Sequence, residues 1–514
     1  MQSRLRAVLD LMIPTAREEA GRHEYDGQIQ DLSDEGVQRA LHAIELSSTA
    51  SSAATPTAPD DLLRDPHDDA HLAAFEQGAL LEYGALAAHR TNPLVHLFNL
   101  ELTCYERDYA PKIERDQALT RHLGRWPDAV DMAVKALDQV AAPVAASLVE
   151  AARGLALGIP HELPGAPEAA IAQQRFVQHL EQCAATGSPE TAIGESALAQ
   201  LMGVSNATEV DINALASQAD QEKLRLLALL GDACHQLRPG TPVTDVVAEL
   251  IADHPDADGV IDEAKTLTDD VIAFTTARGL VSHLDGECVV GLSPPSRRWA
   301  TAMLSWAAPG ERDTPTRYDI TPPEPSWPVD EQTEWLSMFN RASMMAITVH
   351  EVAPGHFAHS RALRRAPGDI RRTLYSNAFA EGWAHYTEEM LLEEGYRADD
   401  PRYAAGVALE ALCRVTRLSC AIGLHTGQLT VAEATKRFQS DAFLSEAAAR
   451  SEAQRGTFDP TYGIYTWGKW EILRTREEAK QAWGSNFSLR RFHDALLELG
   501  SPPIGLLSTA VSRG

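Results

Sequence analysis

The chain has 514 residues, of which 44% are hydrophobic and 23% charged, so it can bury a large core and is not disordered throughout. Its 73 acidic residues outnumber its 45 lysines and arginines, and the formal net charge at pH 7 is −28. Because nucleic acids and anionic membranes attract basic surfaces, this charge argues against either partner.

The first twenty residues contain no apolar run long enough for a signal peptide, and no stretch approaches the ~18 apolar residues of a membrane span. The six cysteines are scattered and form no CxxC pair, which is typical of buried reduced thiols. We therefore expect a cytoplasmic protein.

Alanine-rich segments with apolar residues three or four positions apart dominate the chain and predict helices. Residues 46–60, which precede the first of these segments, are rich in serine, threonine and proline and predict a linker. The clearest helical pattern covers 131–157, with a kink expected at Pro143 and an end at Gly158. Similar patterns cover 62–90, 168–185, 221–237, 262–278, 403–426 and 431–448.

Strand signals are few. Residues 287–292 are the best candidate strand, and the proline-rich segment 314–328 is expected to be extended. The dipeptide His161-Glu162 begins like a metal motif, but no second histidine follows at a useful spacing, so we expect a loop there. The fold class is mainly α.

The region most typical of an enzyme site begins with an apolar run, 344–349, that leads directly into His350 and Glu351. A histidine followed at once by a glutamate on a buried helix is the first half of a zinc-hydrolase motif, in which the histidine binds zinc and the glutamate is the general base. The second histidine usually lies four residues after the first. Here that position is Pro354, and the next histidine is His356.

A spacing of six between two ligands requires an interrupted helix. At about 100° per residue, His356 lies about 240° around an unbroken helix from His350, too far for both to bind one ion. Pro354 cannot donate a backbone hydrogen bond, and Gly355 tolerates unusual dihedral angles. A break that absorbs two residues restores an effective spacing of four, about 40° apart. We therefore predict that the helix is interrupted at Pro354 and Gly355.

The third ligand is expected from a second helix, on which Glu381 is followed by a histidine and a glutamate on the same face. Zinc prefers histidine nitrogen plus one carboxylate, with a position left for water, and His350, His356 and Glu381 match this set. A buried polar network without a metal is the alternative. Further residues are predicted as supporting groups or alternative ligands: His359, His385 and Glu388.

These segments resemble a known bacterial family. Residues 350–356, HEVAPGH, and 381–388, EGWAHYTE, are similar to the HExxPGH and EGWAxYxE motifs of the family called domain of unknown function 885. The segments 417–425 and 465–469, with Arg476 beyond them, extend the resemblance over about 320–480.

The resemblance implies a large helical zincin-like metallopeptidase fold of the gluzincin type, with a deep central cleft and minimal β structure. Residues 1–275 are then an N-terminal helical half that forms a wall of the cleft. Residues 276–514 are the catalytic half, which carries both metal-binding motifs.

The resemblance implies the same three zinc ligands and the same base, Glu351. It adds Tyr465 as a candidate donor to the developing oxyanion and His425 as a further catalytic residue that lines the pocket. Ala421 stands where many family members place an aspartate, which implies an altered substrate contact or altered chemistry.

Five arginines lie between the two metal-binding segments, within residues 361–372, which we call the arginine segment. An arginine there could clamp the terminal carboxylate of a peptide, because a guanidinium matches a carboxylate bidentately. The alternative, which we favour, is that the segment pairs with the protein's own acidic residues.

We therefore expect a zinc-dependent hydrolase of peptide or amide bonds that acts on a short peptide or a small amide, with metal-bound water activated by Glu351. One alternative is a metal-dependent enzyme of specialised metabolism that uses non-haem iron, or manganese, on a non-peptide small molecule. A second alternative is a helical scaffold without activity. The substrate itself, the exo or endo mode of cleavage and the oligomeric state are not predicted.

Overall fold

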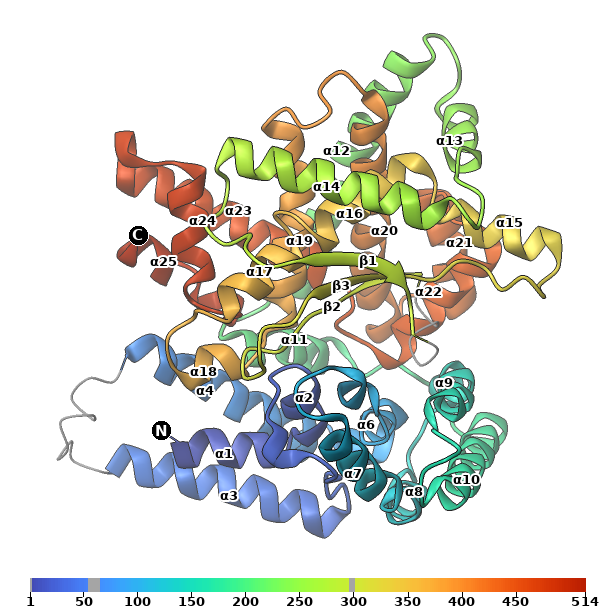
Figure 1. Cartoon of the computed structure of the whole chain (residues 1–514), viewed down its shortest axis with the longest axis vertical. Coiled ribbons are helices and arrows are strands. Elements are labelled where there is room, and N and C mark those ends of the chain that lie inside the picture. The colour runs from blue at the N-terminus through green and yellow to red at the C-terminus, as the bar shows by residue number, and fades with distance from the viewer. Residues whose placement is uncertain (1, 54–64, 295–300) are drawn as a thin grey trace.

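The computed structural model describes residues 2–53, 65–294 and 301–514 (Figure 1). Within these ranges helices dominate and the strands form one small sheet, so the expected mainly α class is confirmed. No described helix is long and apolar enough to cross a membrane.

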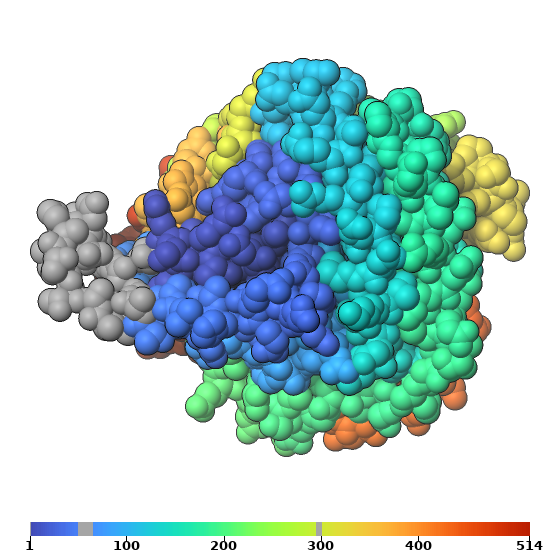
Figure 2. Space-filling model, turned by 90° about the horizontal axis from the view of Figure 1, so that it is seen from below, coloured from blue at the N-terminus to red at the C-terminus, as the bar shows by residue number. Residues whose placement is uncertain are grey.

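The N-terminal part of the chain forms a set of packed helices in the lower half of Figure 1. Seen from below, these helices cover the centre of the face, and later segments are visible only around its edge (Figure 2). The helices are α1 (Gln2–Asp10), α2 (Ile13–Glu18), α3 (Asp34–Ala53), α4 (Pro66–Ala79), α5 (Ala88–Thr91), α6 (Pro93–Phe98), α7 (Lys112–Leu123), α8 (Trp126–Ala136), α9 (Ala142–Gly154) and α10 (Ala166–Thr186), with the π-helix η2 (Leu80–Ala85) after α4.

The prediction of one kinked helix over 131–157 is wrong, because the chain forms two helices there, α8 and α9. Pro143 lies in the first turn of α9, where its missing N–H leaves no hydrogen bond unmade, so it starts a helix and does not bend one. Gly158 ends a short 3-10 segment after α9, close to the expected end. Residues 161–165 form turns, as predicted.

The predicted linker at 46–60 is wrong in its first part, because α3 continues to Ala53 and its alanines favour helix. Residues 54–60 lie outside the described ranges, as do residues 62–64 of the next predicted helix. The pattern at 431–448 corresponds to two helices that are separated at Phe443, which has a positive φ of 57°.

The sheet has the order β1–β3–β2, with β1 (Cys288–Leu292) parallel to β3 (Thr316–Ile320) and β2 (Ala302–Ser305) antiparallel to it. The predicted strand at 287–292 is therefore confirmed, and the extended segment at 314–328 contains β3. The remaining helices are α11 (Glu195–Gly203), α12 (Ile212–Leu237), α13 (Val243–Ala252), α14 (Val260–Arg278), α15 (Val329–Ser337), α16 (Arg341–Glu351), α17 (His356–Leu363), α18 (Gly368–Thr373), α19 (Asn377–Glu393), α20 (Pro401–His425), α21 (Val431–Ala442), α22 (Glu446–Phe458), α23 (Ile464–Trp483), α24 (Leu489–Leu497) and α25 (Thr509–Arg513).

The largest hydrophobic core cluster extends from Leu198 to Ala510 and surrounds α16, α19 and α20. It also includes residues of α12 and α14, on the N-terminal side of residue 275. A second cluster, between Leu97 and Leu180, holds α8, α9 and α10 together. A third lies among the first helices and includes Ile370 of α18. The C-terminal part therefore packs directly on the N-terminal helices.

Between these parts lies a cavity of about 2820 Å³. Its lining comes from both sides, with Glu82 and Ser147 from the N-terminal helices and His350, Glu351 and Tyr465 from the C-terminal part. The helices that carry the predicted motifs therefore face a space large enough for a short peptide or another small molecule.

Candidate metal centre

The helix that carries His350 is interrupted where the sequence predicts it. α16 ends at Glu351, and α17 begins at His356. The chain returns so closely at Gly355 that an added Cβ would lie 1.9 Å from the carbonyl oxygen of His350, so only glycine fits. The indole Nε1 of Trp383 on α19 donates to the carbonyl oxygens of Pro354, at 3.0 Å, and Gly355, at 3.3 Å. The Trp383 side chain thus fixes the break against the helix that carries the third predicted ligand.

This break brings the three predicted ligands together. Ligand atoms of His350, His356 and Glu381 all lie within 4.8 Å of one another. The Glu381 Oε2 atom is 3.3 Å from His350 Nε2 and 3.5 Å from His356 Nε2. The two imidazole rings are nearly perpendicular, with centroids 4.8 Å apart. Two imidazole nitrogens and one carboxylate oxygen at these separations fit a zinc ion, and they leave further coordination positions toward the cavity.

The electrostatics of this cluster favour a cation. Burial disfavours a charged carboxylate, but the imidazoles of His356 and His350 hold the pKa of Glu381 well below its usual range. Burial and Arg414 oppose a charged His350, yet hydrogen bonds with Glu381 and Glu388 raise its pKa to about 9. The carboxylates of Glu381 and Glu388 therefore attract positive charge to the place where the three ligand atoms converge.

A buried carboxylate orients His350. The Nδ1–H of His350 donates to Glu388 Oε1 at 2.7 Å, and Arg414 Nη1 donates to Glu388 Oε2 at 2.8 Å. Glu388 is completely buried, and the hydroxyl of Tyr403 donates to its backbone carbonyl oxygen. Because Glu388 holds the proton on Nδ1, Nε2 is the nitrogen that would give up its proton and offer its lone pair to a metal. Glu388 thus lies behind a ligand and supports it.

The other predicted histidines have partners outside the cluster. His359 Nε2 lies 2.9 Å from the hydroxyl of Ser501, and His385 Nδ1 lies 3.4 Å from Glu388 Oε2. Burial lowers the pKa of both rings to about 3, so they are neutral at physiological pH. The Nε2–H of His425 donates to the carbonyl oxygen of Gly456 at 2.8 Å. His425 borders the cavity, as predicted, but none of its described contacts reaches the three ligands.

Tyr465 lies beside the cluster because α19 and α23 approach unusually closely. A Cβ on Gly468 would lie 1.9 Å from the carbonyl oxygen of Ala378, so glycine is required at this contact. The Tyr465 ring is stacked near that of His350, with centroids 6.3 Å apart and planes 21° apart. Burial and the carboxylate of Glu381 raise the pKa of Tyr465, so its phenol stays protonated and can donate a hydrogen bond.

An aromatic wall near His356 was not predicted from the sequence. Trp306 lies 6.4 Å from His356 and 6.1 Å from Tyr375 between ring centroids, and Tyr375 stacks on His359. Trp306 and Tyr375 both line the cavity. Burial and the charge of Glu381 raise the pKa of Tyr375 well above its usual value. Trp306 is distant in sequence from the motifs, so no local pattern indicated this wall.

The arginine segment does not reach the cavity lining. Arg361 pairs with Asp285 and Asp313, and Arg371 pairs with Asp65 and Asp68. The other three arginines also bond within the protein: Arg364 to the carbonyl oxygens of Ala307, Ala308 and Glu311, Arg365 to Asp285, and Arg372 to Asp369. The favoured alternative, pairing with the protein's own groups, is what the structure shows.

Ala421 is buried in a small apolar cluster with Leu424 and Phe438. It does not line the cavity. Ala421 itself is therefore not placed to contact a molecule in the cavity.

The comparisons with known proteins agree with the fold. The family model described as "Bacterial protein of unknown function (DUF885)" matches residues 14–511, and the chain therefore belongs to this family. A solved structure described as a "putative lipoprotein of unknown function" from Shewanella oneidensis is 19% identical, with a TM-score of 0.78 over 98% of this chain and 97% of that one. Another "putative lipoprotein", from Colwellia psychrerythraea, is 15% identical, with a TM-score of 0.78 over 100% and 98%. No curated protein matches.

Proposed function

We propose that this member of a family of unknown function is a zinc-dependent hydrolase of peptide or amide bonds that acts on a short peptide or a small amide. The observation that carries the proposal is the convergence of His350, His356 and Glu381 beside a large cavity that Glu351 also lines. Two histidines and a carboxylate with open positions are typical of catalytic zinc. The description as a helical zincin of the gluzincin type belongs to the same proposal.

Each of the surrounding residues has a role in this reaction. When bound, zinc supplies a Lewis acid that polarises a carbonyl group and lowers the pKa of water. Glu351 accepts a proton from the attacking water and passes it to the leaving amine. Tyr465 donates a hydrogen bond to the carbonyl oxygen as negative charge develops on it. Glu388 and Arg414 hold the ring of His350, so that its Nε2 faces the other ligands.

The substrate class follows from the shape and charge of the cavity. A space of about 2820 Å³ within a chain of net charge −28 suits a small molecule or short peptide and disfavours nucleic acid. A cytoplasmic location stays a prediction.

The same ligand set supports a second candidate. Two histidines and one carboxylate with open positions are also the ligands of many non-haem iron enzymes. An iron- or manganese-dependent enzyme acting on a non-peptide small molecule would use the same three residues. The adjacent Glu351 and the protonated Tyr465 favour hydrolysis, because they provide a base and a hydrogen-bond donor.

The decisive experiment combines metal analysis with turnover. We expect about one zinc per chain in the purified protein, and we expect Glu381→Ala to lose it. Glu351→Gln should keep zinc and reduce hydrolysis of short peptides at least about 100-fold, because it removes the general base. Glu334→Gln is the matched control, since Glu334 lines the same cavity but lies outside the ligand cluster, and it should keep both zinc and turnover.

Three results would reject the hydrolase. Wild-type turnover by Glu351→Gln would show that the base is wrong. Bound iron with consumption of oxygen would support the second candidate. Failure to bind any divalent metal would support the inactive scaffold.

A further inference from the structure

Two arginines line the cavity next to Tyr465 and were not singled out for this role by the sequence. Arg417 lies on α20 and Arg455 on α22. The guanidinium carbon of Arg417 is 5.3 Å from the centroid of the Tyr465 ring. The Tyr465 ring also stacks near the ring of His350, so Arg417 and one of the proposed metal ligands lie next to the same aromatic ring.

Each arginine is held in place by an acidic residue. Arg417 donates from Nε and Nη2 to the two carboxylate oxygens of Glu452, both at 2.7 Å. Arg455 donates from Nε and Nη2 to Asp459 Oδ2, at 3.3 and 3.1 Å. These pairs fix both guanidinium groups before any ligand binds, which reduces the entropy lost on binding.

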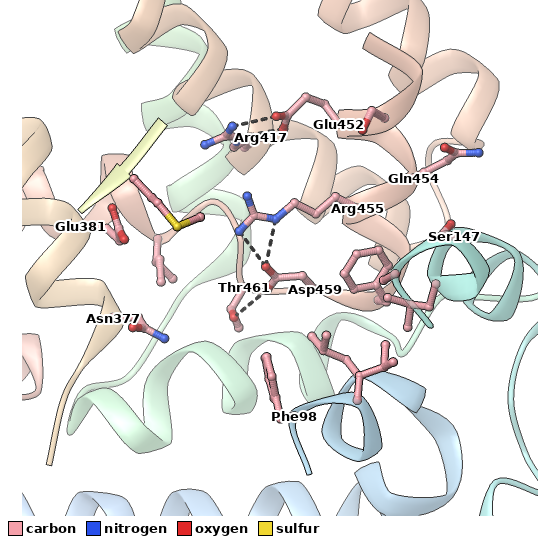
Figure 3. A pocket seen from close by; sticks show the side chains of 18 of the residues that line it. Phe98, Ser147, Asn377, Glu381, Arg417, Glu452, Gln454, Arg455, Asp459 and Thr461 are labelled. Atoms are coloured by element: carbon pink, nitrogen blue, oxygen red, sulfur yellow. Dashed lines mark hydrogen bonds and ion pairs between the residues drawn. The ribbon is translucent and has the colours of Figure 1, made fainter. Parts of the chain in front are cut away.

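The pairing leaves one nitrogen of each guanidinium group available. Among the described residues, Nη1 of Arg417 and Nη1 of Arg455 have no hydrogen-bond partner. In Figure 3 the Arg455 nitrogen that is not bonded to Asp459 points toward Arg417. Two cations that face a common space repel each other, and an anion between them removes that repulsion. A carboxylate has two oxygens and can accept from both groups.

The described part of the cavity lining holds no second pair of arginines next to Tyr465. Within the described parts of the chain, the basic side chains of the lining other than histidines are four arginines, of which Arg107 precedes α7 and Arg317 lies on β3. Arg107 bonds to Glu311 through both Nε and Nη2, and Arg317 pairs with Asp319. The wall that the N-terminal helices contribute also carries several glutamates: Glu18, Glu82, Glu150 and Glu190.

We propose that Arg417 and Arg455 bind the carboxylate of the substrate, so that the enzyme cleaves an amide bond close to a free carboxyl terminus. This inference rests on the proposed hydrolase function and names its substrate class: short peptides with a free carboxyl end, or N-acyl amino acids. In the reaction, water adds its oxygen to the acyl carbon, the C–N bond breaks, and the amine leaves with the proton that Glu351 transferred. The products are a carboxylic acid and an amine whose own carboxylate stays with the arginines.

Equilibrium binding tests the subsite separately from catalysis. The probes are acetyl-Ala-Ala-Phe with a free carboxylate and the same peptide with a carboxamide end, titrated into zinc-loaded Glu351→Gln protein in a calorimeter. We expect the carboxylate to bind about tenfold more tightly than the carboxamide. Arg455→Gln in the same background should remove this difference without weakening carboxamide binding.

Two matched variants control this measurement. Arg317→Gln removes a cavity-lining arginine on the sheet side and should leave the tenfold preference unchanged. Arg417→Gln combined with Glu452→Gln removes the other proposed contact without leaving a buried carboxylate unpaired, and should reduce the preference as Arg455→Gln does.

The outcomes separate the subsite from the hydrolase. Equal binding of the two probes, no binding of either at millimolar concentration, or a preference that survives Arg455→Gln would overturn the subsite. Wild-type protein that hydrolyses both peptides equally well would also overturn it, while the hydrolase would stand. A carboxylate preference that depends on Arg455, in a protein without hydrolytic activity, would confirm the subsite as a binding site and reject the hydrolase.

Discussion

Two groups of arginines in this protein resemble each other in charge and differ in what surrounds them. The arginine segment, 361–372, concentrates five arginines in a short stretch, and all five bond to acidic side chains or carbonyl oxygens of the protein. Arg417 and Arg455 are far apart in sequence, yet they meet at the cavity, and each keeps one nitrogen without a partner among the described residues. A dense run of charge therefore indicates structural pairing here, and the proposed ligand contacts come from isolated residues that the fold brings together.

The arginine segment joins the two sides of the molecule. Arg371 on α18 reaches Asp65 and Asp68 at the start of α4, and Arg364 donates to three carbonyl oxygens in the loop 307–311. These bonds fix α17 and α18 between the N-terminal helices and that loop. If the arginine segment is structural, substitutions in it change stability and leave the candidate metal centre intact.

The largest effect is expected for Arg371→Ala. The Arg371 side chain is only 3% exposed, and its removal leaves Asp68 without an ion-pair partner among the described residues and Asp65 with Arg513 alone. Breaking such a pair should lower the free energy of unfolding by about 3 kcal/mol. Urea denaturation measures this value, and zinc content should not change. A variant of full stability would show that the segment is not a structural connection.

An intermediate effect is expected from pH, through His23. Its ring donates to Asp26 at 3.2 Å and to Glu311 at 3.1 Å, on the same loop that Arg364 holds from the other side. Burial opposes the charged ring, but these hydrogen bonds raise the pKa of His23 to about 9 from the usual 6.5. The charged ring therefore stabilises the fold fully below pH 6.5, and this contribution is lost as the pH rises through about 9.

We expect this loss to be about 2 kcal/mol of unfolding free energy, since the His23 side chain is partly exposed. Denaturation at several pH values between 6 and 10 measures it. In His23→Gln, the free energy of unfolding should lack this loss of about 2 kcal/mol between pH 6 and 10. If the variant shows the same pH dependence as the wild type, the effect belongs to another group.

The smallest effect is expected for Arg372→Ala. Among the described residues, Arg372 forms an ion pair only with Asp369, three residues earlier, and donates to the carbonyl oxygen of Gly368; the Arg372 and Asp369 side chains are both exposed. The free energy of unfolding should change by less than about 0.5 kcal/mol, because exposed pairs contribute little. The same denaturation experiment that tests Arg371 provides this value. If Arg372→Ala lowered the free energy of unfolding as much as Arg371→Ala, the position of an arginine in the segment would affect stability more than its burial does.

The sequence predicted the elements of this fold better than their limits. Apolar periodicity located α10, α12, α14 and α20 correctly, because each buries one continuous face. The same periodicity predicted α8 and α9 as one helix, because the apolar period continues across residues 137–141, where the chain turns. Periodicity describes a buried face, and two consecutive helices that pack on one core share it.

The candidate site was predictable where chemistry and spacing coincide. His350, His356 and Glu381 were placed together because the helix break at Pro354 could be argued from local backbone preferences. The support that Arg414 gives to His350 could not be predicted in this way, because it depends on how α16 and α20 pack. Charge and residue type alone do not specify such tertiary contacts.

The contact between Gly382 and Gly468 has a consequence for how this protein can change. No side chain separates α19 from α23 there, so the distance between these helices is set by backbone alone. Tyr465 lies one turn before Gly468, and Glu381 is adjacent to Gly382. A single methyl group at either glycine would push the Tyr465 phenol away from the candidate ligands without altering any of their side chains. The geometry of the proposed reaction thus depends on two residues that have no functional groups.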